Sequence, residues 1–353
     1  MIGKNSIIVS ALLVALCSCG GREEERAVIE LPLAGESVDI GEDESLFGIC
    51  YADDSILLAR TLSPSFFLVS YRLDGSRQPY EFVDAGRGPK EILRGAFRCR
   101  RDTVFVLSGT GYGINGVLAV PVSSIWEKSR WEYTAFPEQS GVWRGEFDVL
   151  DGGSGYVFVG GRHGDRTIIS TISRDGSDLE SLGYWPGDSY TGSPLPKQNE
   201  YAASGILCNG DKLLFASSEG RYASIIDLAA GGKETVLYGD YPEYSAASDG
   251  INARRSERSW RGVRAYANGS HIYVLPINAK IKDGNWAPSD YKGYPPDYND
   301  LVDVFDWEGR YECSYRLDVP ACDLYVAEDD TVIYALTVDN QSLTSRIRRY
   351  FRD

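Results

Sequence analysis

Asn209-Gly210-Asp211-Lys212-Leu213-Leu214-Phe215-Ala216-Ser217 joins a polar turn to a short apolar run. A turn with Gly and Asp that leads into aliphatic and aromatic residues is typical of a β-hairpin. The same pattern occurs six times along the chain. The other copies begin at the turns Asp53–Ser55, Arg101–Thr103, Gly152–Gly155, Asn268–Ser270 and Asp329–Thr331.

Successive copies of this hairpin lie roughly 50–60 residues apart, which suits a four-stranded propeller blade with long loops. A closing element, Gly-x-x-Pro followed by an acidic residue, ends three of the units at Gly86–Pro89, Gly183–Pro186 and Gly239–Pro242. Pro137, Pro320 and Pro32 occupy the corresponding places in the other units. Because proline cannot donate to a β-ladder, we expect it to stop the outer strand of each blade.

The two ends of the chain predict how the ring closes. Ala27–Pro32 reads as a strand that precedes the first hairpin, and Arg346–Phe351 is only the third strand of the last unit. An N-terminal strand that completes the last blade removes the exposed edges of an open sheet. We therefore expect an all-β fold, a single six-bladed β-propeller over residues 27–353, rather than an open solenoid or a sandwich.

The first eighteen residues predict a lipoprotein signal peptide. Lys4 precedes an apolar run from Ile7 to Leu16, which is too short to span a membrane. Leu16-Cys17-Ser18-Cys19 resembles a lipobox, with cleavage before Cys19 and lipidation of its thiol. The lipid bilayer is then a partner through Cys19, because several acyl chains give a stable anchor.

Residues 19–26 form a charged, glycine-containing tether with three consecutive glutamates, Glu23–Glu25. Acidic clusters at this place resemble surface-export signals of Bacteroidetes lipoproteins. We expect the protein in the cell envelope, anchored to the outer membrane. Surface display and retention on the periplasmic face both stay open.

Charge and cysteine content restrict the partners and the chemistry. The net charge of −15 excludes nucleic acid, which needs a basic face. Of the five cysteines left after Cys19, Cys313 and Cys322 are close enough in sequence to suggest a disulfide, and their spacings match no zinc site. We expect Cys50, Cys99 and Cys208 to be buried thiols at the starts of inner strands.

The run Gly86-Arg87-Gly88-Pro89-Lys90-Glu91 resembles the end of a blade in the TolB-like six-bladed β-propeller lipoproteins of Bacteroidetes. That family usually has Gly where this chain has Lys90. The resemblance covers residues from about 27 to 353. It implies the propeller fold and the envelope location, and no particular activity.

The sequence contains no clear catalytic motif. Its two histidines, His163 and His271, fall in a hairpin turn and at the start of a strand, and no Gly-x-Ser-x-Gly motif occurs. We identify no cofactor and no metal ligand. A divalent cation held by carboxylates in the central channel stays possible, although no residues mark such a site.

Two loops are candidate ligand-binding segments. Asp249–Gly262 carries Arg254, Arg255, Arg258, Trp260 and Arg261, either as a solvated loop paired with carboxylates or as an anion clamp at the channel mouth. Asn278–Asn299 is an insertion that carries Trp286, Tyr291, Tyr294 and Tyr298. These rings suit a sugar or a peptide, and equally a loop that packs on itself.

These observations predict a non-catalytic binding module for a protein, peptide or oligosaccharide partner at the channel face or rim. The alternative is a propeller hydrolase or lyase with a carboxylate-bound divalent metal in the central channel. A third possibility is a structural subunit of an outer-membrane assembly.

Overall fold

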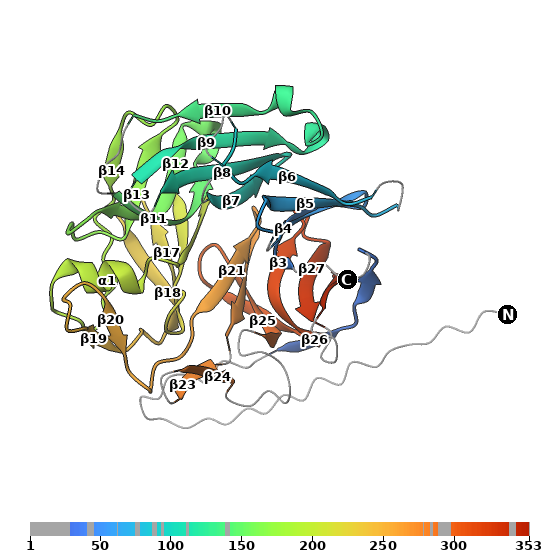
Figure 1. Ribbon diagram of the computed structural model, residues 1–353. Helices are drawn as coiled ribbons and strands as arrows, with labels where there is room; N and C mark the ends of the chain where they lie inside the picture. The colour runs from blue at the N-terminus through green and yellow to red at the C-terminus, as the bar shows by residue number, and fades with distance from the viewer. Residues whose placement is uncertain are drawn as a thin grey trace.

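The computed structural model describes residues 29–40, 46–61, 63–74, 78–86, 90–92, 95–110, 113–137, 142–277, 279–282, 285–288, 298–338 and 344–352. Within these ranges nearly all regular structure is β-strand. Each predicted hairpin turn separates the first two strands of a four-stranded unit. The predicted all-β propeller is therefore confirmed, and Figure 1 shows its blades following one another around a ring.

Blades 1 to 4 are separate antiparallel sheets whose strands follow the order of the sequence. Their strands are β3 (Leu46–Ala52), β4 (Ile56–Thr61), β5 (Phe66–Arg72) and β6 (Tyr80–Asp84) in blade 1; β7 (Gly95–Arg100), β8 (Thr103–Thr110), β9 (Gly113–Pro121) and β10 (Glu132–Ala135) in blade 2; β11 (Val142–Val149), β12 (Gly155–Arg162), β13 (Ile169–Ser173) and β14 (Leu179–Ser181) in blade 3; and β15 (Gly205–Asn209), β16 (Lys212–Ala216), β17 (Tyr222–Asp227) and β18 (Lys233–Gly239) in blade 4.

One continuous sheet supplies blades 5 and 6. Its long strand β26 (Tyr311–Val326) belongs to both, because its first half pairs with β25 and its second half with β27. Pro320 lies inside β26, near the change of partner, and does not end a strand as predicted. The other strands are β21 (Val263–Ala267), β22 (His271–Pro276) and β25 (Asn299–Asp306) in blade 5, and β27 (Val332–Val338) and β28 (Ser345–Phe351) in blade 6.

An N-terminal strand does complete the last blade, but it is not the predicted one. β2 (Glu36–Val38) pairs antiparallel with β28, whereas β1 (Glu30–Leu33) pairs parallel with the first half of β26 on the outer edge of blade 5. Arg316 holds β1 there, with Nε and Nη2 at 2.9 and 3.0 Å from the Glu30 carboxylate oxygens. The prediction placed the closing strand at Ala27–Pro32, six to nine residues before β2, because it assigned Pro32 to the closing element of the last blade. Residues 27 and 28 lie outside the described residues.

Both faces of each blade are buried, so successive side chains along a strand pack against different neighbouring blades. In β4, Ile56 and Leu58 pack toward blade 2, while Leu57 and Ala59 pack toward blade 6. Among the described residues, six apolar clusters fill the six spaces between consecutive blades, including the space between blades 6 and 1. The buried apolar residues therefore close the ring.

The first strand of each blade lines a central channel, and neighbouring first strands are in contact around the whole ring. The six predicted hairpin turns lie at one end of the channel. The connections between blades lie at the other end, with α1 (Pro194–Glu200) and the hairpin of β19 (Tyr244–Ala246) and β20 (Ala253–Arg255) side by side (Figure 1). Short elements elsewhere are β23 (Ala279–Lys282), β24 (Asn285–Pro288) and three 3-10 turns at Val122–Ser124, Lys128–Arg130 and Asp151–Gly153. Within the described ranges, no helix is both long and apolar enough to cross a membrane.

Candidate functional site

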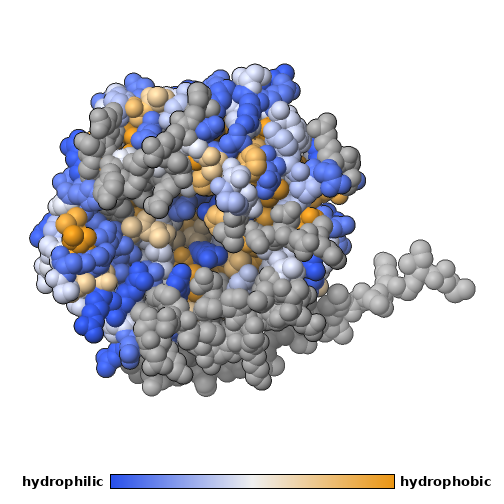
Figure 2. Space-filling view, in the orientation of Figure 1, coloured by the Kyte–Doolittle hydropathy of each residue, from blue (hydrophilic) through white to orange (hydrophobic). Residues whose placement is uncertain are grey.

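The channel widens into a cavity at each end, and Figure 2 shows one face of the molecule hollowed at its centre. The cavity beside the hairpin turns, here called the hairpin mouth, has a volume of about 650 Å³. The cavity at the opposite end, here called the arginine mouth, has a volume of about 370 Å³. Both volumes lie within the range of small-molecule sites. Arg98 and Cys99 line both cavities and mark the boundary between them.

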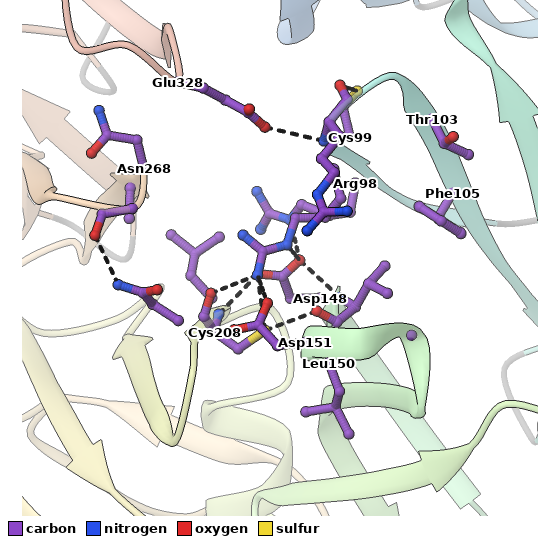
Figure 3. A pocket seen from close by; sticks show the side chains of 18 of the residues that line it. Arg98, Cys99, Thr103, Phe105, Asp148, Leu150, Asp151, Cys208, Asn268 and Glu328 are labelled. Atoms are coloured by element: carbon purple, nitrogen blue, oxygen red, sulfur yellow. Dashed lines mark hydrogen bonds and ion pairs between the residues drawn. The ribbon is translucent and has the colours of Figure 1, made fainter.

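At the hairpin mouth, the charged side chains form ion pairs and hydrogen bonds with one another (Figure 3). The carboxylate of Asp148 is buried, with Oδ1 at 3.7 Å from Arg98 Nε and 3.5 Å from Arg100 Nε. Its Oδ2 accepts the backbone N–H of Cys208 in blade 4 at 2.9 Å. Arg100 also donates to the Cys208 carbonyl at 2.8 Å and to Asp151 at 3.2 Å. Burial opposes the charge of Arg100, but Asp148, Cys208 and Asp151 together outweigh burial and raise the pKa of Arg100. This network joins blades 2, 3 and 4.

The arginine mouth has an excess of positive charge. The described residues that line it include four arginines and two carboxylates: Arg60, Arg98, Arg261 and Arg264 with Glu146 and Asp323. Because Arg98 is paired with Asp148 of the hairpin mouth, the other lining residues carry three positive and two negative charges, a net charge of +1. Arg60 lies 3.7 Å from Glu146, and about a third of the Glu146 side chain is exposed. Burial disfavours the Arg60 charge, but Glu146 and Asp323, together with Cys50 and Tyr266, outweigh burial and raise the pKa of Arg60. The guanidinium also lies 5.0 Å from the ring of Phe47, which is 40% exposed.

Asp323 differs from Glu146 because its hydrogen bonds are made within the fold. Its Oδ2 accepts the backbone N–H of Ile49 in blade 1 at 2.6 Å, and its Oδ1 accepts the Tyr266 hydroxyl of blade 5 at 2.6 Å. Burial, followed by the neighbouring Asp323, raises the pKa of Tyr266 well above its ordinary value. Asp323 therefore connects blades 5, 6 and 1, as Asp148 connects blades 2, 3 and 4.

The predicted arginine loop separates into different environments. Arg255 Nε donates to both oxygens of the buried Glu200 carboxylate at 3.1 Å, and its Nη2 lies 3.2 Å from Glu219. Arg254 and Arg258 are exposed. Trp260 stacks between two cations, and Arg261 alone of the five lines the arginine mouth. The structure thus brings one member of the predicted clamp to the channel.

Most of the predicted aromatic insertion lies outside the described residues. Tyr291 and Tyr294 fall there, as does the side chain of Trp286, whose backbone belongs to β24. Tyr298 is described, and it packs against the apolar cluster between blades 6 and 1. The role of this insertion in binding stays a prediction.

The described cysteines are not joined to one another by disulfides, and His271 lies beside two carboxylates. Cys50, Cys99, Cys208, Cys313 and Cys322 are free thiols, so the suggested pair of Cys313 and Cys322 forms no disulfide in this structure. Cys50, Cys99 and Cys208 lie near the ends of inner strands rather than at their starts. Burial raises the pKa of Cys50 and of Cys208 to about 12. His271 opens β22 as predicted and lies 2.6 Å from Asp330 of blade 6 and 3.1 Å from Glu312.

Nothing in the described ranges gathers three His, Cys, Asp or Glu side chains that could hold a metal ion. The buried carboxylates of the channel, Asp148 and Asp323, already accept hydrogen bonds from neighbouring blades.

Cys19 and the tether lie outside the described residues, and the lipid anchor stays a prediction.

Sequence reasoning missed Arg60, Arg98, Arg264, Glu146 and Asp323. A signal was present in β7, where Arg98 and Arg100 alternate with Cys99 and therefore point to the same side of the strand. Two arginines on the channel side of an inner strand indicate a buried anionic partner. The identity of that partner depends on which blades are neighbours.

No protein-family model matches the chain, and no curated protein matches it. Similar solved structures include a Bacteroides thetaiotaomicron protein of unknown function, with 11% identity, a TM-score of 0.49 and coverage of 92% of this chain and 75% of that chain. The WD40 repeats of RRP9 are 10% identical, with a TM-score of 0.44 and coverage of 90% and 97%. An oligogalacturonate lyase in complex with manganese is 11% identical, with a TM-score of 0.38 and coverage of 92% and 97%. At these identities and TM-scores, none of them indicates a ligand or an activity for this chain.

Proposed function

We propose that this chain is a membrane-anchored, non-catalytic binding module that takes a carboxylate-bearing ligand, at the end of a peptide or of an oligosaccharide, in the arginine mouth. One observation carries the proposal: the mouth is lined by four arginines and two carboxylates, although the whole chain has a net charge of −15. Positive charge gathered in a concave site attracts anions and concentrates them there.

The chemistry of arginine supports a carboxylate as the recognised group. The guanidinium is planar and always charged, and it donates two parallel hydrogen bonds to a carboxylate. One of the two carboxylates in the mouth, Asp323, makes its hydrogen bonds to the Ile49 N–H and the Tyr266 hydroxyl. The other, Glu146, is partly exposed and lies 3.7 Å from Arg60, so an incoming carboxylate competes with a weak ion pair.

Matched ligands test this proposal. Calorimetry should compare a short peptide with a free C-terminal carboxylate and the same peptide as its amide, and a uronate oligosaccharide with its neutral counterpart. Binding of one acidic member and not of its neutral counterpart supports the proposal. Equal binding of both members of a pair contradicts carboxylate recognition, and metal analysis of the purified protein then tests the alternative of a metal-dependent hydrolase or lyase.

The anchor is the second part of the proposal, and it is supported by the lipobox at Leu16–Cys19 and the acidic tether that follows. The resemblance to TolB-like lipoproteins of Bacteroidetes supports the same location, in the outer membrane of the cell envelope. Cys19→Ala should release the protein from the membrane or leave it uncleaved. Membrane retention of a cleaved, unlipidated Cys19→Ala protein would contradict the anchor.

A further inference from the structure

Trp260-Arg261-Gly262 forms the middle of a short three-stranded seam at the arginine mouth. On one side lies the loop between β16 and β17, and on the other lies β23 of the blade 5 insertion. Four backbone hydrogen bonds hold the seam. Gly220 N–H donates to the Trp260 carbonyl at 2.8 Å, and Gly262 N–H donates to the Ser218 carbonyl at 3.0 Å. On the other side, Arg261 N–H donates to the Ala279 carbonyl at 2.8 Å, and Ile277 N–H donates to the Gly262 carbonyl at 3.0 Å. The seam therefore joins blade 4 to blade 5.

The side chains of Trp260 and Arg261 lie on opposite sides of this seam. In an extended segment, successive side chains point to opposite faces. Arg261 lines the arginine mouth, and Trp260 does not. The indole of Trp260 instead lies between two cations, with the Arg221 guanidinium 3.7 Å and the Lys280 ammonium 3.8 Å from its ring centroid.

The stack of two cations on one indole fixes Trp260 in place. The face of an aromatic ring attracts a cation through its quadrupole, and both cations lie within 4 Å of the ring centroid. One cation comes from the loop after β16 and the other from β23, and the ring bridges the two outer members of the seam. A side chain held from both sides in this way resists sliding of its own segment.

We propose that Trp260 is a positioning residue that sets the register of the seam and thereby keeps Arg261 in the arginine mouth. This inference rests on the proposed function for its ligand. A slip of one residue exchanges the two faces of an extended segment. It would turn Trp260 into the mouth and remove Arg261 from it.

Gly262 supports the same register. A Cβ atom at this position would lie 2.1 Å from the Ser217 carbonyl oxygen and 2.2 Å from the Ser218 carbonyl carbon. These are backbone atoms, which cannot move aside as the end of a side chain can. A slip would place Arg261 or Val263 at this point of close contact, so the glycine excludes the shifted register sterically while the cation stack holds Trp260.

Two variants separate positioning from general stability. Trp260→Ala removes the ring, whereas Trp260→Tyr keeps an aromatic face for both cations. We expect Trp260→Ala to weaken binding of the carboxylate peptide about tenfold, and Trp260→Tyr to restore most of it. Arg258→Ala, at an exposed position of the same loop, is the matched control and should leave the affinity unchanged. Urea unfolding of each variant shows that the fold persists.

A second measurement needs no ligand. Arg261→Cys places a thiol in the mouth, and its reaction rates with an anionic and a cationic methanethiosulfonate are compared, after subtraction of the parent protein's rates. We expect the anionic reagent to react severalfold faster, because the other arginines of the mouth attract it. When Trp260→Ala is combined with Arg261→Cys, this preference should disappear and both rates should change.

The outcomes distinguish the two proposals. If Trp260→Ala changes neither the affinity nor the reaction rates of the thiol introduced by Arg261→Cys, the positioning role is overturned and the binding function stays intact. If that thiol shows no preference for the anionic reagent while Trp260 is present, the proposed function is contradicted. In that case a change of the absolute rates on Trp260→Ala still supports the register, and identical rates overturn it.

Discussion

The two mouths of the channel use the same residue type in different ways. At the hairpin mouth, Arg98 and Arg100 meet Asp148, whose side chain is 1% exposed and which also binds the next blade. At the arginine mouth, Arg60 Nη1 lies 3.7 Å from Glu146 Oε1, and the Glu146 side chain is 35% exposed. The burial of the partner, rather than the arginine itself, therefore separates an arginine that holds the ring together from one that we propose binds a ligand.

Removing Asp148 tests the structural half of this comparison and should have the largest effect. Asp148→Ala leaves Arg98 and Arg100 without their shared buried carboxylate and Cys208 N–H without its acceptor. We expect the free energy of unfolding in urea to fall by about 3–5 kcal/mol. Asp102→Ala, at an exposed position of the same mouth, should change it by less than about 0.5 kcal/mol. Equal losses of stability for the two substitutions would contradict a special structural role of the buried Asp148 carboxylate.

Removing Arg60 tests the binding half. Its ion pair with Glu146 is partly exposed, so Arg60→Ala should lower the free energy of unfolding by only about 1 kcal/mol or less. A charge-assisted hydrogen bond to a ligand is worth about 1.5–3 kcal/mol, so the affinity for the carboxylate peptide should fall at least about tenfold. Calorimetry and urea unfolding of the same sample measure both quantities. A large loss of stability with unchanged affinity would show that Arg60 stabilises the ring and does not bind the ligand.

Alkaline pH sharpens the comparison at Asp323, the buried carboxylate of the arginine mouth. Because the pKa of Tyr266 is raised in the folded protein, its contribution to stability is complete below the unfolded-state pKa of 10 and is lost as pH rises above it. Tyr266→Phe removes one hydrogen bond to Asp323 and should cost roughly 1 kcal/mol at pH 8. It should also make the decrease in stability between about pH 8 and about pH 10.5 smaller than in the parent protein. An identical decrease in both proteins would show that Tyr266 does not contribute to it.

A change in salt concentration should have the smallest effect of these tests. It should alter ligand affinity at the arginine mouth and leave the contribution of Asp148 to stability at the hairpin mouth nearly unchanged. Exposed charges are screened more than buried ones, so raising ionic strength from about 0.05 M to about 0.5 M should weaken carboxylate binding roughly threefold. The destabilisation caused by Asp148→Ala should change little over the same range, because burial shields the Asp148 carboxylate, which is 1% exposed, from the added ions. Salt-independent binding would indicate that the arginines do not contribute to affinity.

The hairpin repeat predicted the blades because each copy contains its own turn and its own apolar run. The closing strand was harder to place, because β1 and β2 are both short and both pair with strands about 300 residues away. Pro32 lies in β1, so the proline pattern identified a strand that joins blade 5 rather than the one that completes blade 6.

The candidate site depended on contacts that a sequence does not contain. Alternation shows that Arg98 and Arg100 share one side of β7, but Asp148 and Cys208 meet them only after blades 2, 3 and 4 close around the channel. The arginine loop showed an unusual concentration of charge. It did not show that Glu200 at the end of α1 binds Arg255 and leaves Arg261 at the mouth.

The place of β1 has a consequence for how a ligand approaches. β1 lies on the outermost edge of blade 5, so the chain enters the fold from the circumference of the ring and not from either end of the channel. The ten residues from Gly20 to Ile29 span at most ~36 Å when fully extended. With the lipid on Cys19, as we propose, the point of attachment blocks neither opening. Both openings of the channel are then accessible to a ligand.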